Sequence, residues 1–407
     1  MKTRCKTSKT PKLTSKMRSI PMPSSVWKKS YIKALVSFAL WGVLACVGYG
    51  AKVEVALINR SAWVYPLNSP ASFDFASKME MLAFVRHFQA LQNLDDNALK
   101  AYIQSKVKNP NLNSMRAYFA RMQTKILTNF EAITKAEHKR EKLPYDFLPT
   151  LKSPIKWRDV LHLSQYATHK LPPELTKWQE SADVFYAQYL LEQVRLAALF
   201  PNITSEILPL GELEILGDEL QDKHFILTFD DGPTPKGGNT DRLIALLENL
   251  NIQAMFFVLG ENLNKRGDVG KLYANMVVGY HGDVHKPHTK PEIYQNAPAQ
   301  SQKVATLGST SKCYFRPPYG QRNLSLLQML ENAGCKVVLW NLDSQDWGSI
   351  APQAMLDRII TLSLLWRSGI LLFHDVHTKS YDILPHFVRT LRECGVKLGE
   401  ITLEKIQ

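Results

Sequence analysis

Short runs of β-forming residues alternate with helical stretches throughout the second half of the chain. Strands that are separated by helices pair in parallel, because each helix returns the chain to the edge of the sheet where the next strand begins. This alternation predicts an α/β fold with a parallel sheet or a (β/α) barrel. The expected strands span residues 224–229, 253–259, 313–316, 336–341 and 369–373, and the expected helices span residues 240–250, 324–333, 352–365 and 383–393.

Residues 69–208 are expected to form an all-α helical domain of unknown role. Between residues 114 and 141, apolar side chains recur at steps of three and four, which places them in one stripe along a helix. A second long helix is expected after residues 172–173, and shorter helices near residues 73–91 and 96–107. The aromatic side chains of this region would suit a ligand groove, but the core of a helix bundle is the favoured interpretation.

Residues 1–51 join a basic leader to an apolar stretch. Residues 1–33 contain ten basic and no acidic residues, and residues 34–51 contain no charged residue. Such a segment is typical of a secretory signal peptide or of a single membrane anchor. Both interpretations predict an exported protein in the periplasm, the cell envelope or the medium. Cleavage, lipidation at Cys46 and retention as an anchor by residues 34–51 all remain open.

The net charge of +13 comes mostly from this leader. Outside the leader, the chain contains 40 of its 50 Lys and Arg residues and all 37 Asp and Glu residues. This near balance predicts no large basic surface, so we expect no nucleic-acid partner.

The cysteines allow few covalent links. Cys5 lies in the basic leader and Cys46 in the apolar stretch, so Cys313, Cys335 and Cys394 can form at most one disulfide among themselves. Export would permit this bond, and the sequence leaves the pair open. The chain contains no Cys-x-x-Cys motif, which argues against a thiolate zinc site.

Polar residues gather at the C-terminal ends of the predicted strands, which is the edge where β/α barrels carry their active sites. Asp230 and Asp231 follow the first strand, in the sequence Thr-Phe-Asp-Asp-Gly-Pro. The other polar segments are residues 281–285 (His-Gly-Asp-Val-His), 316–320 (Arg-Pro-Pro-Tyr-Gly), 343–347 (Asp-Ser-Gln-Asp-Trp) and 371–375 (Leu-Leu-Phe-His-Asp).

These residue types match the needs of a metal-dependent hydrolase. One carboxylate and two histidines can bind a divalent metal and leave a position open for water. A second carboxylate can then act as general base, and a histidine that titrates near neutrality can act as general acid. Each motif alone has a simpler explanation, such as a turn for Asp-Asp-Gly-Pro. Their combination, in this order and mostly at strand ends, favours a hydrolytic metal site.

The five ordered motifs resemble those of the polysaccharide deacetylase (NodB homology) family, a carbohydrate esterase type, and the resemblance covers residues 213–407. It implies a distorted (β/α) barrel that binds a divalent metal, usually zinc and sometimes cobalt. It also implies hydrolysis of N-acetyl groups from an amino-sugar polysaccharide, with release of acetate. The expected partner is an N-acetylated glycan such as peptidoglycan, a chitin-like polymer or poly-N-acetylglucosamine.

The resemblance implies a role for each matching residue of the reaction centre. Asp231, His281 and His285 would bind the metal. Asp230 would act as the general base, and His374 would act as the general acid that protonates the departing amine.

The resemblance also implies a set of supporting residues. Arg316 would hold and tune Asp230, and Asp346 would orient His374. The backbone N–H of Tyr319 would help to stabilise the oxyanion. Asp343 would support its loop. The residues expected to wall the pocket for the acetyl methyl group are Trp347, Leu371 and Pro318.

The second motif departs from the family pattern, because Gly282 stands where Ser or Thr is usual. In addition, His288 lies three residues after His285, so these two form a rival ligand pair. The family spacing favours His281 with His285. We expect the remaining histidines to be bystanders, namely His224, His288 and His377. Met255, which replaces the Thr usual before the Phe-Phe pair, is expected to affect packing only.

Two other functions stay open. The fold implied by the resemblance also serves deformylases and other hydrolases of carbon–nitrogen bonds. A non-catalytic glycan-binding protein is the third interpretation, which the complete set of ligands, base and acid disfavours.

Overall fold

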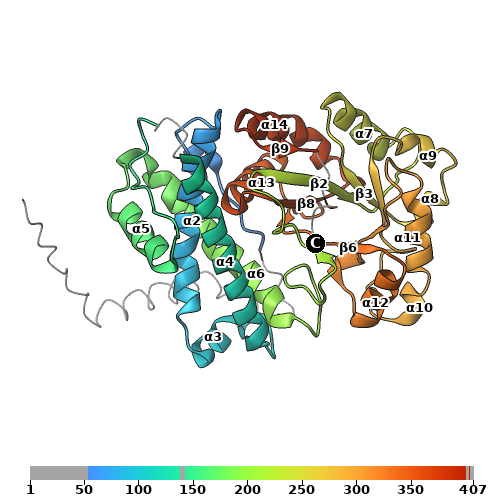
Figure 1. Ribbon diagram of the computed structural model, residues 1–407, viewed down its shortest axis with the longest axis horizontal. Coiled ribbons are helices and arrows are strands. Elements are labelled where there is room, and N and C mark those ends of the chain that lie inside the picture. Colours follow the sequence, from blue (N-terminus) through green and yellow to red (C-terminus); the bar gives the residue numbers. More distant parts are fainter. Residues whose placement is uncertain (1–53, 138–142, 400–402, 404–407) are drawn as a thin grey trace, which may run out of the picture. The chain divides into compact units, whose positions relative to one another are not determined.

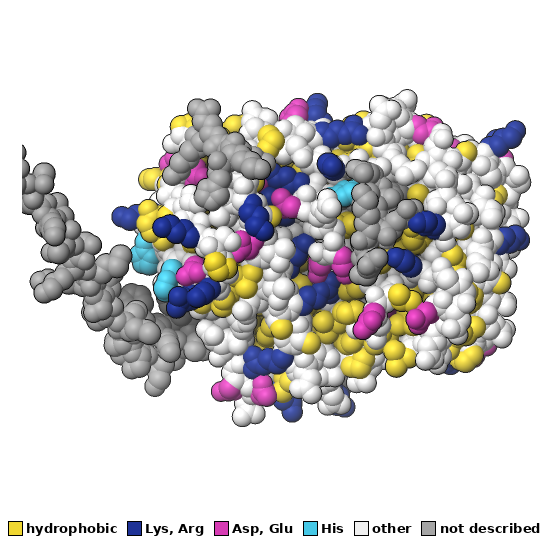
Figure 2. Space-filling view, in the orientation of Figure 1, with side chains coloured by type: hydrophobic (Ala, Val, Ile, Leu, Met, Phe, Trp, Pro, Cys, Tyr) yellow, Lys and Arg dark blue, Asp and Glu magenta, His cyan; other side chains and the backbone are white. Residues whose placement is uncertain are grey.

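The computed structural model describes residues 54–137, 143–399 and 403, all of which belong to one compact unit, Lys52–Gln407. The basic leader and the apolar stretch of residues 1–51 lie outside the described residues. Within the described ranges, no helix has both the length and the hydropathy that crossing a bilayer requires. Figure 2 shows that Lys and Arg side chains are interspersed with Asp and Glu over one face of the molecule, and that hydrophobic side chains gather between α6 (Thr176–Leu199) and α12 (Leu324–Asn332).

The first half of the described chain is helical, as expected. Helix α2 begins after a capping box in which Ser69 and Ser72 satisfy each other's backbone N–H groups. It is buried around most of its circumference, because α4, α5, α6 and α13 all pack against it. The helices of this half are η1 (Arg60–Ala62), α2 (Pro70–Gln92), α3 (Asp96–Ile103), α4 (Leu112–Glu137), α5 (Trp157–His169), η2 (Pro173–Leu175) and α6 (Thr176–Leu199).

The second half forms one parallel sheet with surrounding helices, consistent with a distorted (β/α) barrel. The described strands are ordered β1-β6-β5-β4-β3-β2-β8-β7, and β9 pairs with β2. The edge strands β1 and β7 do not pair with each other within the described residues, so the sheet is a half-barrel with an open side. The strands are β1 (Glu214–Ile215), β2 (His224–Asp230), β3 (Met255–Val258), β4 (Val277–Tyr280), β5 (Tyr314–Phe315), β6 (Lys336–Val338), β7 (Leu342–Asp343), β8 (Gly369–His374) and β9 (Lys397–Leu398).

The centre of the sheet is an aromatic core. Phe229 on β2 stacks on Phe256 of β3 and on Phe373 of β8, with ring centroids 5.1 and 5.5 Å apart. Figure 1 shows α7 to α12 around one side of the sheet, and α2, α4, α5 and α6 on the side of α13. The helices of this half are α7 (Asn239–Asn249), α8 (Gly260–Leu263), α9 (Val269–Leu272), α10 (Pro291–Tyr294), α11 (Ala297–Ala305), η3 (Pro318–Gly320), α12 (Leu324–Asn332), α13 (Pro352–Trp366) and α14 (Lys379–Glu393).

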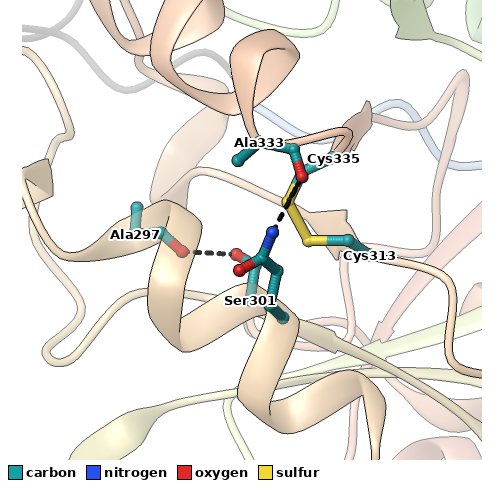
Figure 3. The surroundings of a disulfide bond; sticks show 6 residues. Ala297, Ser301, Cys313, Ala333 and Cys335 are labelled. Carbon is teal, nitrogen blue, oxygen red and sulfur yellow. Dashed lines mark hydrogen bonds between the residues drawn. A yellow bond between two sulfur atoms is a disulfide. The ribbon is translucent and has the colours of Figure 1, made fainter.

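A disulfide links the starts of two neighbouring strands. Cys313 precedes β5 and bonds to Cys335, which precedes β6, and Cys394 is a buried free thiol. Figure 3 shows the bond beside α11, where Ser301 donates a hydrogen bond of 2.7 Å to the carbonyl of Ala297. The structure thus selects one of the pairs that the sequence left open.

Candidate active site

Three predicted metal ligands converge at the C-terminal edge of the sheet. One ligand atom from each of Asp231, His281 and His285 lies within 4.8 Å of the other two. The Nε2 atoms of both histidines are 3.5 Å from Oδ1 of Asp231. Asp231 follows β2 with a φ of 84°, an uncommon backbone conformation for a residue with a side chain. The backbone is fixed there by the Asn262 side chain, which donates to the Asp231 carbonyl at 2.8 Å.

The chemistry of these atoms fits a divalent cation. Nδ1 of His281 lies 2.8 Å from the carbonyl oxygen of Arg316, so the proton belongs on Nδ1 and the lone pair on Nε2. This Nε2 and Oδ1 of Asp231 are buried and have no hydrogen-bond partner. Burial also lowers the pKa of His281 to about 3, which keeps the ring neutral. Two buried acceptors that face each other are costly unless a cation lies between them.

The rival ligand His288 is not part of this group. Its Nδ1 lies 2.8 Å from the carbonyl of Lys286, and its ring packs against Phe315 with centroids 5.3 Å apart. Gly282 has a φ of 92°, and a Cβ atom there would lie 2.4 Å from the His288 ring. The unusual glycine in the second motif is therefore explained by the position of His288.

The predicted base is held by a fully buried arginine. Asp230 accepts a hydrogen bond of 2.8 Å from Nη1 of Arg316, and its other carboxylate oxygen lies 3.7 Å from Nε2 of His281. Burial raises the pKa of Asp230, and the positive charge of Arg316 opposes this rise. A carboxylate with a raised pKa is a stronger base, provided that it stays ionised.

The predicted acid is held by a carboxylate. Nδ1 of His374 and its backbone N–H each lie 2.7 Å from an oxygen of Asp346. Burial alone would lower the pKa of His374, but Asp346, with Asp230 and Asp231, raises it to about 9. Because Asp346 accepts the Nδ1 proton, Nε2 is the ring nitrogen of His374 that can exchange a proton with a bound molecule.

The loop that carries Asp346 is fixed by α14. Lys379 at the start of this helix donates to the backbone carbonyls of Asp346 and Gly348, the former at 3.0 Å. Trp347 lies between these two carbonyls in sequence and is 49% exposed. Asp343 accepts hydrogen bonds from Gln345 at 2.8 and 2.7 Å, and burial raises its pKa to about 6.

These side chains share one cavity of about 720 Å³. Asp230, Trp347 and His374 line it, and so does Tyr319, whose ring lies 4.4 Å from that of His285. Another part of its wall comes from α4, α6 and residues 203–207. In the sequence, a ligand groove in the helical region was the less favoured interpretation, because this region carries no catalytic motif.

Two residues predicted to wall the acetyl pocket do not line the cavity. Leu371 is fully buried, while its neighbour Leu372 lines the cavity on the same face of β8 as His374. Pro318 is buried and is likewise absent from the cavity wall, where Tyr319 lies instead. The alternation of side chains along a strand thus corrects the prediction from Leu371 to Leu372.

Known proteins resemble the part of the chain that carries this site. The family model for polysaccharide deacetylase matches residues 217–338. The bifunctional xylanase/xylan deacetylase of Cellvibrio japonicus is 28% identical over 186 residues, which are 43% of this chain and 26% of that protein. The peptidoglycan-N-acetylglucosamine deacetylase PgdA of Listeria monocytogenes is 25% identical over 269 residues, which are 64% of this chain and 54% of that protein.

The chain thus spans about a quarter and about half of these two relatives. Among solved structures, the family 4 carbohydrate esterase from Streptomyces lividans is 28% identical, with a TM-score of 0.39, over 45% of this chain and 95% of that one. The match of the family model covers Asp230, Asp231, both predicted histidine ligands and Arg316. Residues 217–338 therefore belong to a domain of the polysaccharide deacetylase family.

Proposed function

We propose that this protein hydrolyses N-acetyl groups of an amino-sugar polysaccharide and releases acetate, with zinc as the expected metal. One observation carries the proposal: the buried, unpaired Nε2 of His281 and Oδ1 of Asp231 face each other, with Asp230 beside them. Relatives named as deacetylases of xylan and of peptidoglycan support it. On this proposal, residues 213–407 are the deacetylase domain.

Asp231, His281 and His285 would hold the metal, which supplies a Lewis acid and a water of lowered pKa. Asp230 would accept a proton from the water that attacks the acetamide carbonyl, while Arg316 keeps its carboxylate in place. The backbone N–H of Tyr319 would stabilise the oxyanion. Nε2 of His374 would then protonate the sugar nitrogen as the carbon–nitrogen bond breaks, leaving acetate and a free amine.

We further propose that the protein acts outside the cytoplasm. The uncharged apolar residues 34–51 after a basic leader support export, and they would anchor the chain to the membrane if they are not cleaved. The Cys313–Cys335 disulfide is also in keeping with an oxidising compartment. Fractionation of cells that express the full chain, with detection of the C-terminal half, tests this proposal.

The test of function is acetate release by the full-length protein, loaded with zinc or cobalt, from chitin oligomers, peptidoglycan and poly-N-acetylglucosamine. We expect Asp230→Asn to abolish turnover while the metal content is retained, and Asp231→Asn to lower the metal content as well. Asp382→Asn, at an exposed site on α14, is the matched control. Near-normal activity in both active-site variants would refute the assigned roles, and release of formate instead of acetate would indicate a deformylase.

A further inference from the structure

Helix α4 covers the barrel beside β1 and β8. Asp218 lies just after β1, and its carboxylate accepts a hydrogen bond from Asn341, which precedes β7, and forms an ion pair of 2.6 Å with Arg121 of α4. Lys125, one turn further along α4, donates to the carbonyl of Asp218 at 3.0 Å and to the hydroxyl of Ser368 at 2.8 Å. Helix α4 therefore supplies side-chain donors to Asp218, which follows β1, and to Ser368, which precedes β8.

Helix α6 and the residues after it extend this cover to the predicted active site. The phenol of Tyr189 on α6 accepts a hydrogen bond of 2.9 Å from the indole of Trp366. Beyond the helix, the carbonyl of Ser205 accepts one of 2.8 Å from the buried Arg322. Arg322 lies three residues after Tyr319. The end of the helical region is therefore hydrogen-bonded to the loop that carries Tyr319, whose backbone N–H is the proposed oxyanion donor.

The cavity-facing side of this cover combines apolar and polar side chains. Leu196, Leu199 and Ile203 line the cavity together with Gln193 and Arg195. Within the described residues, Gln193 and Arg195 make no side-chain hydrogen bond or ion pair. In contrast, the two other arginines of the cavity wall are paired, Arg121 with Asp218 and Arg358 with Glu192.

We propose that this wall binds the sugar unit next to the one that loses its acetyl group, an inference that rests on the proposed deacetylase function. The cavity of about 720 Å³ is much larger than an acetamido group, and lies within the usual range of ligand pockets, about 300–1,000 Å³. A sugar ring has apolar C–H faces and a rim of hydroxyl groups. The leucine and isoleucine side chains suit the faces, and Gln193 and Arg195 suit the hydroxyls.

The experiment measures kcat/KM for acetate release from N-acetylglucosamine oligomers of increasing length, with the metal-loaded full-length protein. We expect the wild type to gain in kcat/KM between one unit and several units. Arg195→Ala should reduce this gain about tenfold, because hydrogen bonds from a charged donor are lost. Ile203→Trp should reduce it by filling the cavity from a site that is 47% exposed, where the larger side chain can be accommodated.

Two control variants separate this effect from changes in folding. Val184→Trp lies on α6 at a position that is 70% exposed and outside the cavity wall, and Arg158→Ala removes an exposed arginine of α5. Both should keep the gain with length. The inference is overturned if Arg195→Ala and Ile203→Trp keep the gain too, or if the wild type shows none. If the wild type releases acetate from no glycan, the proposed function itself fails.

Discussion

Arg316 shows how strongly a single residue of this site depends on its partners. Its side chain is fully buried, and its three nitrogens donate to Asp230, to the Thr228 hydroxyl, and to the carbonyls of Val338 and Leu339. Its guanidinium also lies 4.1 Å from the centre of the Phe257 ring. Such a group stabilises the fold only while all of its partners are present.

We therefore expect Arg316→Met to lower the free energy of unfolding by about 3–5 kcal/mol, because it leaves the Asp230 carboxylate buried without a partner. Urea unfolding followed by tryptophan fluorescence measures this change. Arg158→Met, at a side chain that is 72% exposed, should change it by less than about 0.5 kcal/mol. A loss below about 1 kcal/mol in Arg316→Met would show that the Asp230 carboxylate is not confined as described.

The pH dependence of turnover should depend on Asp346. The pKa of His374 is raised to about 9 against the effect of burial, chiefly by the hydrogen bond and charge of Asp346. A general acid acts in its protonated form, so activity should be lost as the pH rises through the pKa of His374. Asp346→Asn removes the charge, so the alkaline limb should move to lower pH, as seen in the pH profile of kcat. An unchanged alkaline limb would exclude His374 as the acid.

At the residue level, the converging ligands were predicted from the ordered motifs and their resemblance to the deacetylase family, and Asp231 alone follows directly from a predicted strand. The error at Leu371 has a physical cause. Strand β8 is buried on both faces, so its residues Gly-Ile-Leu-Leu-Phe show no alternation of apolar and polar side chains that would indicate which face a leucine occupies. Counting two residues back from His374 would have identified Leu372.

At the level of elements, strands β2, β3, β5, β6 and β8 and helices α7, α12, α13 and α14 were predicted, whereas strands β1, β4, β7 and β9 were not. Strands β1, β7 and β9 have two residues each, and β4 has four, which gives no periodic pattern by itself. Their strand conformation comes from neighbours in the sheet. The same holds for the disulfide, since the pairing of Cys313 with Cys335 depends on β5 lying beside β6.

The disulfide should contribute measurably to stability. It spans 22 residues, and by the chain-entropy estimate its removal should lower the free energy of unfolding by about 3 kcal/mol. Urea unfolding of the Cys313→Ser/Cys335→Ser double variant tests this value. Dithiothreitol added to the unfolding mixtures should destabilise the wild type by a similar amount and leave the double variant unchanged. Equal stabilities of oxidised wild type and double variant would contradict the prediction.

For the whole molecule, the sequence predicted a helical domain followed by a deacetylase domain, and this division stays a prediction. The sequence could not predict the ion pairs that form between the two regions. Arg367, at the end of α13, donates to Asp74 of α2 at 2.9 Å and to Asp222 at 2.7 Å. Arg358 pairs with Glu192 of α6 at 2.9 Å. Partners separated by more than a hundred residues leave no local sequence pattern.

These shared buried charges lead us to expect that residues 52–407 unfold in a single transition. If the helical region unfolded first, it would leave Arg367 and Arg358 without their partners in α2 and α6, at a cost of several kcal/mol for each pair. Far-UV circular dichroism, which reports the helices, and near-UV dichroism should then give coincident urea curves. Asp74→Asn should shift both curves by the same amount to lower urea, while Asp382→Asn should shift neither. Two separated transitions in the wild type would instead mean that the helical region folds independently, and the wall of the cavity could then open without unfolding the sheet.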